Sequence, residues 1–510
     1  MDNLQLPTLL LRLFRIYRLA AKEADLELAV PNQSTAWRRY LATNFVANPG
    51  MFQDAFFSRD GSEPVPLMIK AEGIWMFDEH GKAYIDGSSG PIACNIGHAN
   101  GCVAHAMYQQ AMTLDYAYPR VARHTTNAAL TGRLCSLAGA PFERVGLASG
   151  GSEAMDLALK FLRQYAVAKG LSTKRILISN MPSYHGASIG TLAISGDESL
   201  APFLSGFAVA GTKVPAPMTY RGEPGLSPEE IAEQSVAALE NAIVNLGPEN
   251  VLAYVVEPVG GVATGCLVPP PVYFQGIREL CDRYGVFLVF DEILCGAGRT
   301  GKFLALHHLS GCIPDVVVMA KGIAAGYSPL GAVLLPAEPV DELAKLTGFN
   351  FSHTYGANPI SCAAALAVLD EYENHDLIAN AAQIGQHLGR ILRQLMNTSP
   401  IVGDVRGIGL LYAVELVQDK DSKTQFHYDF NVTEVARTEA LKEGLIIYSR
   451  RTSGGKYGDW FIVAPPLTVT RADCDQIGQR LKRMLEGVRH RFEAGRAAGF
   501  PRRSSLEPNS

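Results

Sequence analysis

A lysine closes an apolar run in this 510-residue chain. The segment VVVM, at residues 316–319, has the continuous apolar character of a buried strand, and Lys321 follows it with only small residues beside it. Lysine is rarely buried, because its ammonium group loses its hydration there. Lys321 is therefore either a residue that reaches the surface or one whose amine has a chemical task.

Two acids and a turn of small residues follow other apolar runs in the same way. Glu257 comes after the run VLAYVV, Asp291 comes after VFLVF, and the sequence SGGS occupies residues 149–152. Apolar runs that alternate with helical patterns indicate a parallel sheet with helices on both faces. Because ligands bind at the carboxyl ends of such strands, we expect these residues to gather with Lys321 around one site.

Each of these features has a structural interpretation as well as a chemical one. A helix that begins after small residues can hold a phosphate at its N-terminus, or it can simply be capped. Asp291 can hold a cofactor, or it can form a structural ion pair. Together with a lysine they favour pyridoxal phosphate chemistry, because lysine forms a Schiff base with the aldehyde and an acid keeps the ring nitrogen protonated. Burial also lowers the pKa of a lysine toward that of a reactive amine.

A series of motifs follows one order along residues 65–485. The motifs are IDGSSGPIACNIGHAN (85–100), SGGSEAMDLALK (149–160), SYHG (183–186), EPVGG (257–261), DEILCGAGRTG (291–301), PDVVVMAKG (314–322), GYSPLGA (326–332), HTYGANP (353–359), VRGIGL (405–410) and APPL (464–467). In these motifs and their order the chain resembles the class III aminotransferases, which are pyridoxal-phosphate enzymes of fold type I.

The resemblance implies a role for each site residue. Lys321 would form the internal aldimine with pyridoxal 5'-phosphate and move a proton between substrate and cofactor. Asp291 would pair with the pyridinium nitrogen, and Glu257 would support the cofactor. The other implied cofactor contacts are Gly151 and Ser152 at the phosphate, Tyr184 and Ile293 on the two ring faces (the family usually has valine in place of Ile293), His185 beside Tyr184, and Thr354, which would complete the phosphate site of the partner subunit in a homodimer.

The substrate-binding positions depart from one branch of that family. Members that act on ω-amino acids such as ornithine carry an arginine and a glutamate at the places of Ile462 and Val262. An apolar pair cannot clamp a carboxylate, so the chain resembles the amine:pyruvate branch instead. Its longer loop YSRRTSGGKYGDW offers Arg450, Arg451 and Lys456 for the keto acid and Trp460 for an apolar subsite. A solvated basic loop is the alternative interpretation of the two arginines.

These features predict a transaminase that moves an amino group from an amine or ω-amino acid to a keto acid such as pyruvate, with ping-pong kinetics. An epimerase, aminomutase or decarboxylase on the same scaffold is the alternative, since all of them share carbanion chemistry. A cofactor-binding scaffold without activity is a third hypothesis, and the intact Lys321 and Asp291 argue against it.

The predicted fold class is α/β, of PLP fold type I. We expect a large domain at residues 96–345, with a mostly parallel sheet of the seven-stranded type covered by helices. A smaller α+β domain is expected from residues 51–95 and 346–490. Residues 1–50 are predicted to form an N-terminal helical extension, and residues 491–510 a disordered tail.

Charge and cysteine spacing bear on partners and compartment. A net charge of -5 gives no reason to expect nucleic acid or an anionic membrane as a partner. Nine cysteines without a C-x-x-C pair predict reduced thiols in the cytoplasm and no metal site. The N-terminal stretch LLLRLFRIYRLAAKE is predicted to be an amphipathic packing helix, with an organellar targeting helix as the alternative.

Overall fold

The computed structural model describes residues 65–206 and 211–498. The predicted helical extension at residues 1–50 lies outside the described residues, as do residues 51–64 at the start of the predicted small domain. From Pro66 onward the described residues belong to one compact unit. Among the helices of the described part, none is both long and apolar enough to cross a membrane.

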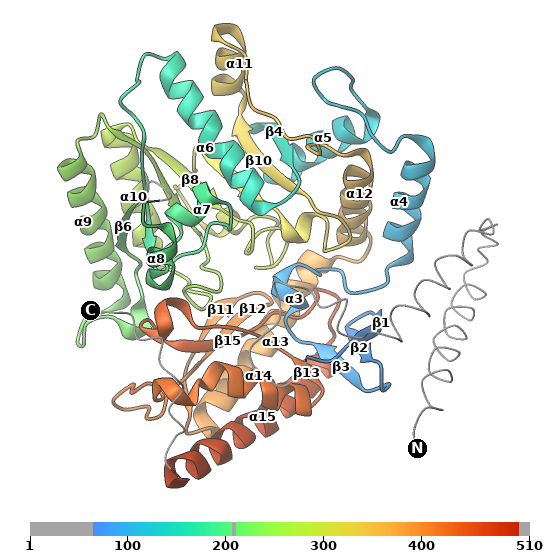
Figure 1. Ribbon diagram of the computed structural model, residues 1–510, viewed down its shortest axis with the longest axis vertical. Coiled ribbons are helices and arrows are strands. Elements are labelled where there is room, and N and C mark those ends of the chain that lie inside the picture. Colours follow the sequence, from blue (N-terminus) through green and yellow to red (C-terminus); the bar gives the residue numbers. More distant parts are fainter. Residues whose placement is uncertain (1–64, 207–210, 499–510) are drawn as a thin grey trace. The chain divides into compact units, whose positions relative to one another are not determined.

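The largest sheet has seven strands and runs through the upper part of Figure 1. Its strand order is β4-β10-β9-β8-β7-β5-β6, and only β10 runs antiparallel to its neighbours. The strands are β4 (Phe142–Ala148), β5 (Ile176–Met181), β6 (Thr212–Pro215), β7 (Val251–Val256), β8 (Phe287–Asp291), β9 (Val316–Met319) and β10 (Gly331–Pro336). The prediction of an α/β fold with a mostly parallel sheet is confirmed.

Helices connect the strands of this sheet and cover it. They are α4 (Gly101–Thr113), α5 (Thr125–Ala138), α6 (Gly151–Ala168), α7 (Ile189–Ile194), α8 (Ala201–Leu204), α9 (Pro228–Leu246), α10 (Pro271–Tyr284), α11 (Ala337–Leu346) and α12 (Pro359–Asn374). Helix α9 begins with a capping box, in which the Ser227 hydroxyl accepts from the Glu230 N–H and the Glu230 carboxylate accepts from the Ser227 N–H. Such caps fix where a helix starts after its strand.

Both faces of the sheet are buried, because alternate residues of each inner strand face opposite helical layers. In β8, Val289 packs in one apolar cluster with α6, while Leu288 and Phe290 pack in another with α9 and α10. Figure 1 shows α6 lying over one face of the sheet. Side chains of a strand alternate between faces, so a strand covered on both sides has to be apolar at every position.

Two four-stranded sheets come from the two ends of the described chain. One has the order β1-β2-β3-β13, with β13 parallel to β3, and the other has the antiparallel order β11-β12-β15-β14. Their strands and the helices that accompany them are β1 (Met68–Glu72), β2 (Trp75–Asp78), β3 (Ala83–Asp86), α3 (Ser89–Ile92), α13 (Leu377–Thr398), β11 (Val402–Ile408), β12 (Leu411–Leu416), α14 (Val432–Lys442), β13 (Leu445–Ile446), β14 (Tyr448–Arg450), β15 (Asp459–Val463) and α15 (Arg471–Ala498). A smaller α+β part is thus built from both chain ends, while its domain boundaries remain a prediction.

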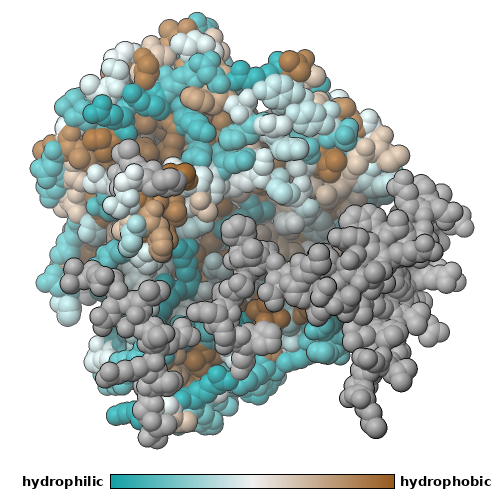
Figure 2. All heavy atoms as spheres, in the orientation of Figure 1, coloured by the Kyte–Doolittle hydropathy of each residue, from teal (hydrophilic) through white to brown (hydrophobic). Residues whose placement is uncertain are grey.

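The last helix corrects the start of the predicted tail. The disordered tail was expected from residue 491, but α15 continues to Ala498. The Phe492 ring packs edge-on against Phe426 with a centroid distance of 4.8 Å, which anchors this part of the helix. Residues 499–510 lie outside the described residues. Figure 2 shows mainly hydrophilic side chains over α15 at the bottom of the view.

A fully buried arginine joins distant segments of the chain. Arg299 follows β8 and has no exposed surface. Its guanidinium donates to the Leu410 carbonyl at 3.1 Å, the Pro465 carbonyl at 2.5 Å, the Ser89 hydroxyl at 3.3 Å and the Asn95 side-chain oxygen at 2.5 Å. Burial lowers the pKa of Arg299 to about 10, so the side chain is still a cation at neutral pH.

We expect Arg299→Met to destabilise the protein strongly. The substitution leaves several buried oxygen acceptors without a donor, which costs about 3 kcal/mol or more. Thermal unfolding followed by circular dichroism measures the effect. The control is Arg144→Met, since Arg144 is an exposed arginine paired with Asp341 and its loss should leave the melting temperature nearly unchanged. Equal melting temperatures for the two variants would contradict the assignment.

Candidate active site

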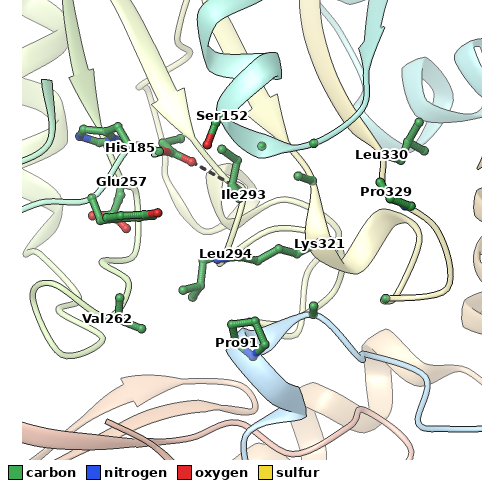
Figure 3. Close-up of a pocket in the computed structure, with 18 of the residues that line it drawn as sticks. Pro91, Ser152, His185, Glu257, Val262, Ile293, Leu294, Lys321, Pro329 and Leu330 are labelled. Atoms are coloured by element: carbon green, nitrogen blue, oxygen red, sulfur yellow. Dashed lines mark hydrogen bonds and ion pairs between the residues drawn. The ribbon is translucent and has the colours of Figure 1, made fainter. Parts of the chain in front are cut away.

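A cavity of about 550 Å³ lies at the carboxyl edge of the seven-stranded sheet (Figure 3). Its volume is ordinary for a small-molecule site. Eight of the nine predicted cofactor residues line it, namely Gly151, Ser152, Tyr184, His185, Glu257, Asp291, Ile293 and Lys321. The predicted set therefore converges on one place, and Thr354 is the exception.

The ends of parallel strands account for this convergence. Asp291 is the last residue of β8, Glu257 follows β7 directly, and Lys321 lies two residues beyond β9. Tyr184 and His185 lie in the connection between β5 and α7. Because these strands run parallel, their carboxyl ends meet at one edge of the sheet, as expected for an open α/β fold.

The backbone at Lys321 is unusual. Lys321 has a φ of 45°, in the left-handed region that residues other than glycine rarely adopt. It begins the short 3-10 turn η5 (Lys321–Ile323) that follows β9. Figure 3 shows its side chain reaching across the cavity toward the side on which Glu257 and His185 lie. Strained backbone of this kind is found preferentially at functional sites.

Burial shifts the Lys321 amine toward its uncharged form. Within the part of the chain that the structure describes, it has no hydrogen-bond or ion-pair partner. Burial lowers the pKa of Lys321, and the nearby Asp291 and Glu257 oppose this only in part. A neutral amine is a nucleophile and a base, whereas an ammonium group is neither.

Asp291 is held by donors on two sides. Its side chain is only 4% exposed. His185 Nδ1 lies 2.9 Å from one carboxylate oxygen, and the Ile293 backbone N–H donates to the other at 3.1 Å. The buried Nε2 of His185 has no hydrogen-bond partner among the described residues. His185 therefore contacts Asp291 and, together with the Ile293 N–H, holds the Asp291 carboxylate in a fixed place at the cavity.

Glu257 is a second acid with a different environment. Its carboxylate accepts a hydrogen bond from the Gly261 backbone N–H at 2.8 Å. Burial raises the pKa of Glu257 to about 7, although His185, the Gly261 N–H and Lys321 act in the opposite direction. Glu257 is therefore partly protonated near neutral pH, so that it can donate as well as accept a hydrogen bond.

The SGGS turn forms a cradle for an anion. Helix α6 begins at Gly151 without a side-chain cap, so its first N–H groups and its dipole are available to a ligand. A Cβ atom on Gly151 would lie 3.1 Å from two side-chain carbons of Ile293 and 3.5 Å from the Ala320 Cβ, so a larger residue would require the Ile293 side chain to shift. The Ser152 hydroxyl accepts from the Ala187 N–H at 3.0 Å and so holds the loop that follows His185.

These features fit pyridoxal phosphate. The cofactor requires an amine for its aldehyde, an acid for its ring nitrogen and donors for its phosphate. The cavity supplies Lys321 as the amine, Asp291 as the acid and the uncapped start of α6 as the source of N–H donors. Tyr184 and Ile293 line the same cavity and offer surfaces for the faces of a flat ring.

The two neighbouring arginines of the C-terminal loop have different environments. Arg450 lines the cavity, with its guanidinium 4.8 Å from the centroid of the Tyr184 ring. Arg451 does not line it: its Nε lies 2.9 Å from the Asp459 carboxylate, and it donates to the Tyr428 carbonyl at 2.9 Å. The prediction of Arg451 as a substrate contact is therefore corrected, because β14 ends between the two residues and their side chains diverge.

Trp460 lies behind the lining of the cavity rather than in it. It has no exposed surface, and its indole N–H donates to the Val262 carbonyl at 2.8 Å. Trp460, Ile462 and Val262 belong to one apolar cluster, and of the three only Val262 lines the cavity. The apolar character predicted for the places of Ile462 and Val262 thus extends into the wall behind the site.

Thr354 lies away from the cavity of its own chain. Its residue is exposed, and its carbonyl accepts a hydrogen bond from the Tyr116 hydroxyl at 3.0 Å. The Tyr355 ring next to it packs edge-on against Tyr116 with a centroid distance of 6.3 Å. A role in the partner subunit's site, as the resemblance implies, remains a prediction.

Several cavity residues were not singled out from the sequence. They are Pro91, Ala93, Leu294, Gly326, Ser328, Pro329, Leu330 and Tyr448. Most of them lie inside motifs that mark the family, such as SGPIA and GYSPLGA. These small and apolar residues carry no chemical signal of their own, so only their place beside the reactive residues identifies them.

Known proteins similar to this chain are aminotransferases. The sequence model described as aminotransferase class-III matches residues 56–485. The uncharacterized aminotransferase YodT of Bacillus subtilis is 32% identical over 418 residues, which cover 82% of this chain and 94% of that protein. The putrescine–pyruvate aminotransferase of Pseudomonas aeruginosa is 29% identical over 429 residues, which cover 82% and 90%. The crystal structure of the omega transaminase from Pseudomonas jessenii in complex with PMP has a TM-score of 0.79 at 30% identity and covers 84% of this chain and 94% of that one.

These likenesses extend across the fold as well as the motifs. They favour amino transfer over the epimerase, aminomutase and decarboxylase alternatives, and over a scaffold without activity. The chain therefore belongs to the class III aminotransferases, enzymes of fold type I that depend on pyridoxal phosphate to transfer an amino group to a keto acid.

Proposed function

We propose that this enzyme takes the amino group from an amine or ω-amino acid and delivers it to a keto acid such as pyruvate, in the cavity around Lys321. The observation that carries the proposal is the convergence of Lys321, Asp291 and the uncapped start of α6 on a cavity with an apolar wall. The relative named putrescine–pyruvate aminotransferase and the solved omega transaminase support this class of substrates.

Each catalytic task falls to a particular residue. Pyridoxal phosphate, when bound, supplies an electron sink that stabilises a carbanion at the substrate carbon. Lys321, whose pKa is lowered by burial, attaches the cofactor and carries the proton to and from the substrate carbon. Asp291, held by His185, keeps the ring nitrogen protonated. Gly151 and Ser152 at the start of α6 hold the phosphate.

The substrate wall favours a donor without an α-carboxylate. Val262, Leu294, Pro91 and Leu330 give the cavity an apolar lining. Among the described residues that line the cavity, Arg450 is the one arginine, and its planar guanidinium is suited to the carboxylate of the keto acid. The donor then needs only its amine and an apolar body.

A homodimer with shared sites completes the proposal. Tyr116 and Tyr355, whose rings pack against each other beside Thr354, are exposed aromatic side chains. Exposed apolar residues grouped in this way mark interaction sites. In the proposed dimer Thr354 reaches the phosphate site of the partner. The nine free thiols of the chain support a reducing, cytoplasmic compartment.

The absorption spectrum of the purified holoenzyme tests the function. A competent amine donor, added alone, should bleach the visible band of the bound cofactor, and pyruvate should restore it. The physical reason is that a transaminase stores the amino group on the cofactor between its two half-reactions. Lys321→Ala is the control, and it should lose turnover by at least about a thousand-fold. A band that no amine bleaches lastingly, with turnover of a single amino compound, would favour the alternative chemistries.

The lowered pKa of Lys321 predicts a pH dependence for cofactor capture. Only the neutral amine attacks the aldehyde, so the rate constant for capture of pyridoxal phosphate by apoenzyme should rise with pH and then level off. Because burial lowers the pKa, the plateau should begin well below pH 10.5, the ordinary value for lysine. Stopped-flow absorbance measures the rate, with Nα-acetyllysine as the control. A plateau at the same pH for both would argue against a depressed pKa.

Mixed dimers test the proposed sharing of sites. Lys321→Ala subunits lack the amine, and Thr354→Val subunits lack the hydroxyl offered to the partner. A heterodimer of the two holds one site with both wild-type residues, so mixing after reversible dissociation should restore activity toward about a quarter of the wild-type value. Mixing Lys321→Ala with itself is the control. If the mixture shows no more activity than the Thr354→Val enzyme contributes, Thr354 does not act in the partner's site.

A further inference from the structure

Arg450 is tied to a buried aspartate from another part of the chain. Its Nη2 donates to the Asp197 carboxylate at 2.9 Å, and Asp197 is 4% exposed while Arg450 is 25% exposed. Asp197 lies after α7, 253 residues before Arg450 in the sequence. Within the described residues this is the only hydrogen bond of the Arg450 guanidinium, so its remaining N–H groups are available to a ligand in the cavity.

The loop after Arg450 holds the same aspartate. The Ser453 backbone N–H donates to the Asp197 carboxylate at 2.9 Å, and the Ser453 hydroxyl accepts from the Glu198 N–H at 2.9 Å. Ser453 has a φ of 49°, in the left-handed region, within the turn η7 (Thr452–Gly455). A non-glycine residue in this conformation costs free energy and persists only where surrounding contacts hold it.

A second acid fastens the far end of this loop. The Glu198 carboxylate lies 2.7 Å from the Lys456 amine and 3.2 Å from the Tyr457 hydroxyl. Glu198 is exposed, and none of its hydrogen bonds involves Arg450. The two neighbouring acids therefore have separate tasks, since Asp197 contacts the cavity arginine and Glu198 contacts only the loop.

Asp197 remains ionised in this arrangement. Burial alone would raise the pKa of its carboxyl, but the Ser199 hydroxyl, the Ser453 N–H and the Arg450 guanidinium together hold it below the usual range. A charged, buried carboxylate with several donors is a rigid anchor. The long side chain of Arg450, which would otherwise sample many rotamers, is thereby fixed above the Tyr184 ring.

We propose that Asp197 is a positioning residue for the keto-acid half-reaction: it holds Arg450 in place so that the free N–H groups of the guanidinium bind the substrate carboxylate. The proposal rests on the proposed function, in which Arg450 binds that carboxylate. Asp197 itself touches neither substrate nor cofactor, and it acts by removing the rotamer freedom that Arg450 would lose on binding. The amine donor, which has no α-carboxylate, does not use this device.

Steady-state and half-reaction kinetics of the holoenzyme test the proposal. Asp197→Ala should raise KM for pyruvate about ten-fold, while the rate of bleaching by the amine donor stays within about two-fold. Asp197→Asn retains an oxygen acceptor for Arg450 and Ser453 and should recover most of the loss. Glu198→Gln is the matched control, with KM for pyruvate within about two-fold of wild type. An unchanged KM in Asp197→Ala, or an equal loss in both half-reactions, overturns the proposal.

A double-mutant cycle separates this proposal from the proposed function. If Asp197 acts through Arg450, Asp197→Ala should have almost no further effect on KM for pyruvate in an Arg450→Gln background. Additive losses in the double variant overturn the positioning role. If Arg450→Gln alone leaves KM for pyruvate unchanged, the carboxylate-binding role of Arg450 itself fails. The cycle also remains informative if Asp197→Ala is poorly folded, because Asp197→Ser, whose side chain is shorter and carries no charge, can take its place in it.

Discussion

The buried guanidinium of Arg299 is the interaction on which the shape of the site depends. Its acceptors come from the segment around Ser89 and Asn95, from Leu410 and from Pro465, which are far apart in the sequence. A buried cation is costly unless hydrogen-bond acceptors surround it. If these segments moved apart, the guanidinium would lose acceptors, so the interaction restrains them. Pro91 and Ala93, which line the cavity, lie in the sequence between Ser89 and Asn95, two hydrogen-bond partners of Arg299. Arg299 therefore fixes the part of the cavity wall around Pro91 and Ala93, although it does not line the cavity itself.

A second constraint follows at the sheet edge, where two charged groups have opposite requirements. In its proposed role Asp291 faces the ring nitrogen of the cofactor, and it receives an N–H from Ile293 and a close contact from His185. Lys321 has to be able to lose its proton, and it receives no partner among the described residues. Burial lowers the pKa of Lys321 and no hydrogen bond among the described residues opposes this, whereas two contacts hold the Asp291 side chain in place.

The sequence was sufficient for the parts of this molecule that repeat a simple physical rule. Continuous apolar runs predicted the inner strands, and the residue after each run predicted the site, because parallel strands end at one edge. The antiparallel direction of β10 could not be predicted from its sequence GAVLLP, because it is set by pairing with β4 and β9 and not by a pattern of residues. Arg450 and Arg451 were equivalent in the sequence, and only the end of β14 between them decides which one faces the cavity. Likewise Trp460 could not be told from a subsite residue until its indole N–H was seen to donate to Val262.

The division between rigid and variable elements explains why the reaction is easier to assign than the substrate. The reactive residues lie on strand ends inside a sheet that is covered on both faces, where one change disturbs many contacts. Arg450, which we propose binds the keto-acid carboxylate, lies beside a long loop that contacts Asp197 and Glu198 on one side and the segment around Tyr428 on the other. At the place of Ile462, an arginine would enter the apolar cluster of Trp460 and Val262 and bury a charge there. The proposed recognition of a carboxylate instead comes from the loop side of the cavity, where Asp197 provides a compensating charge for Arg450.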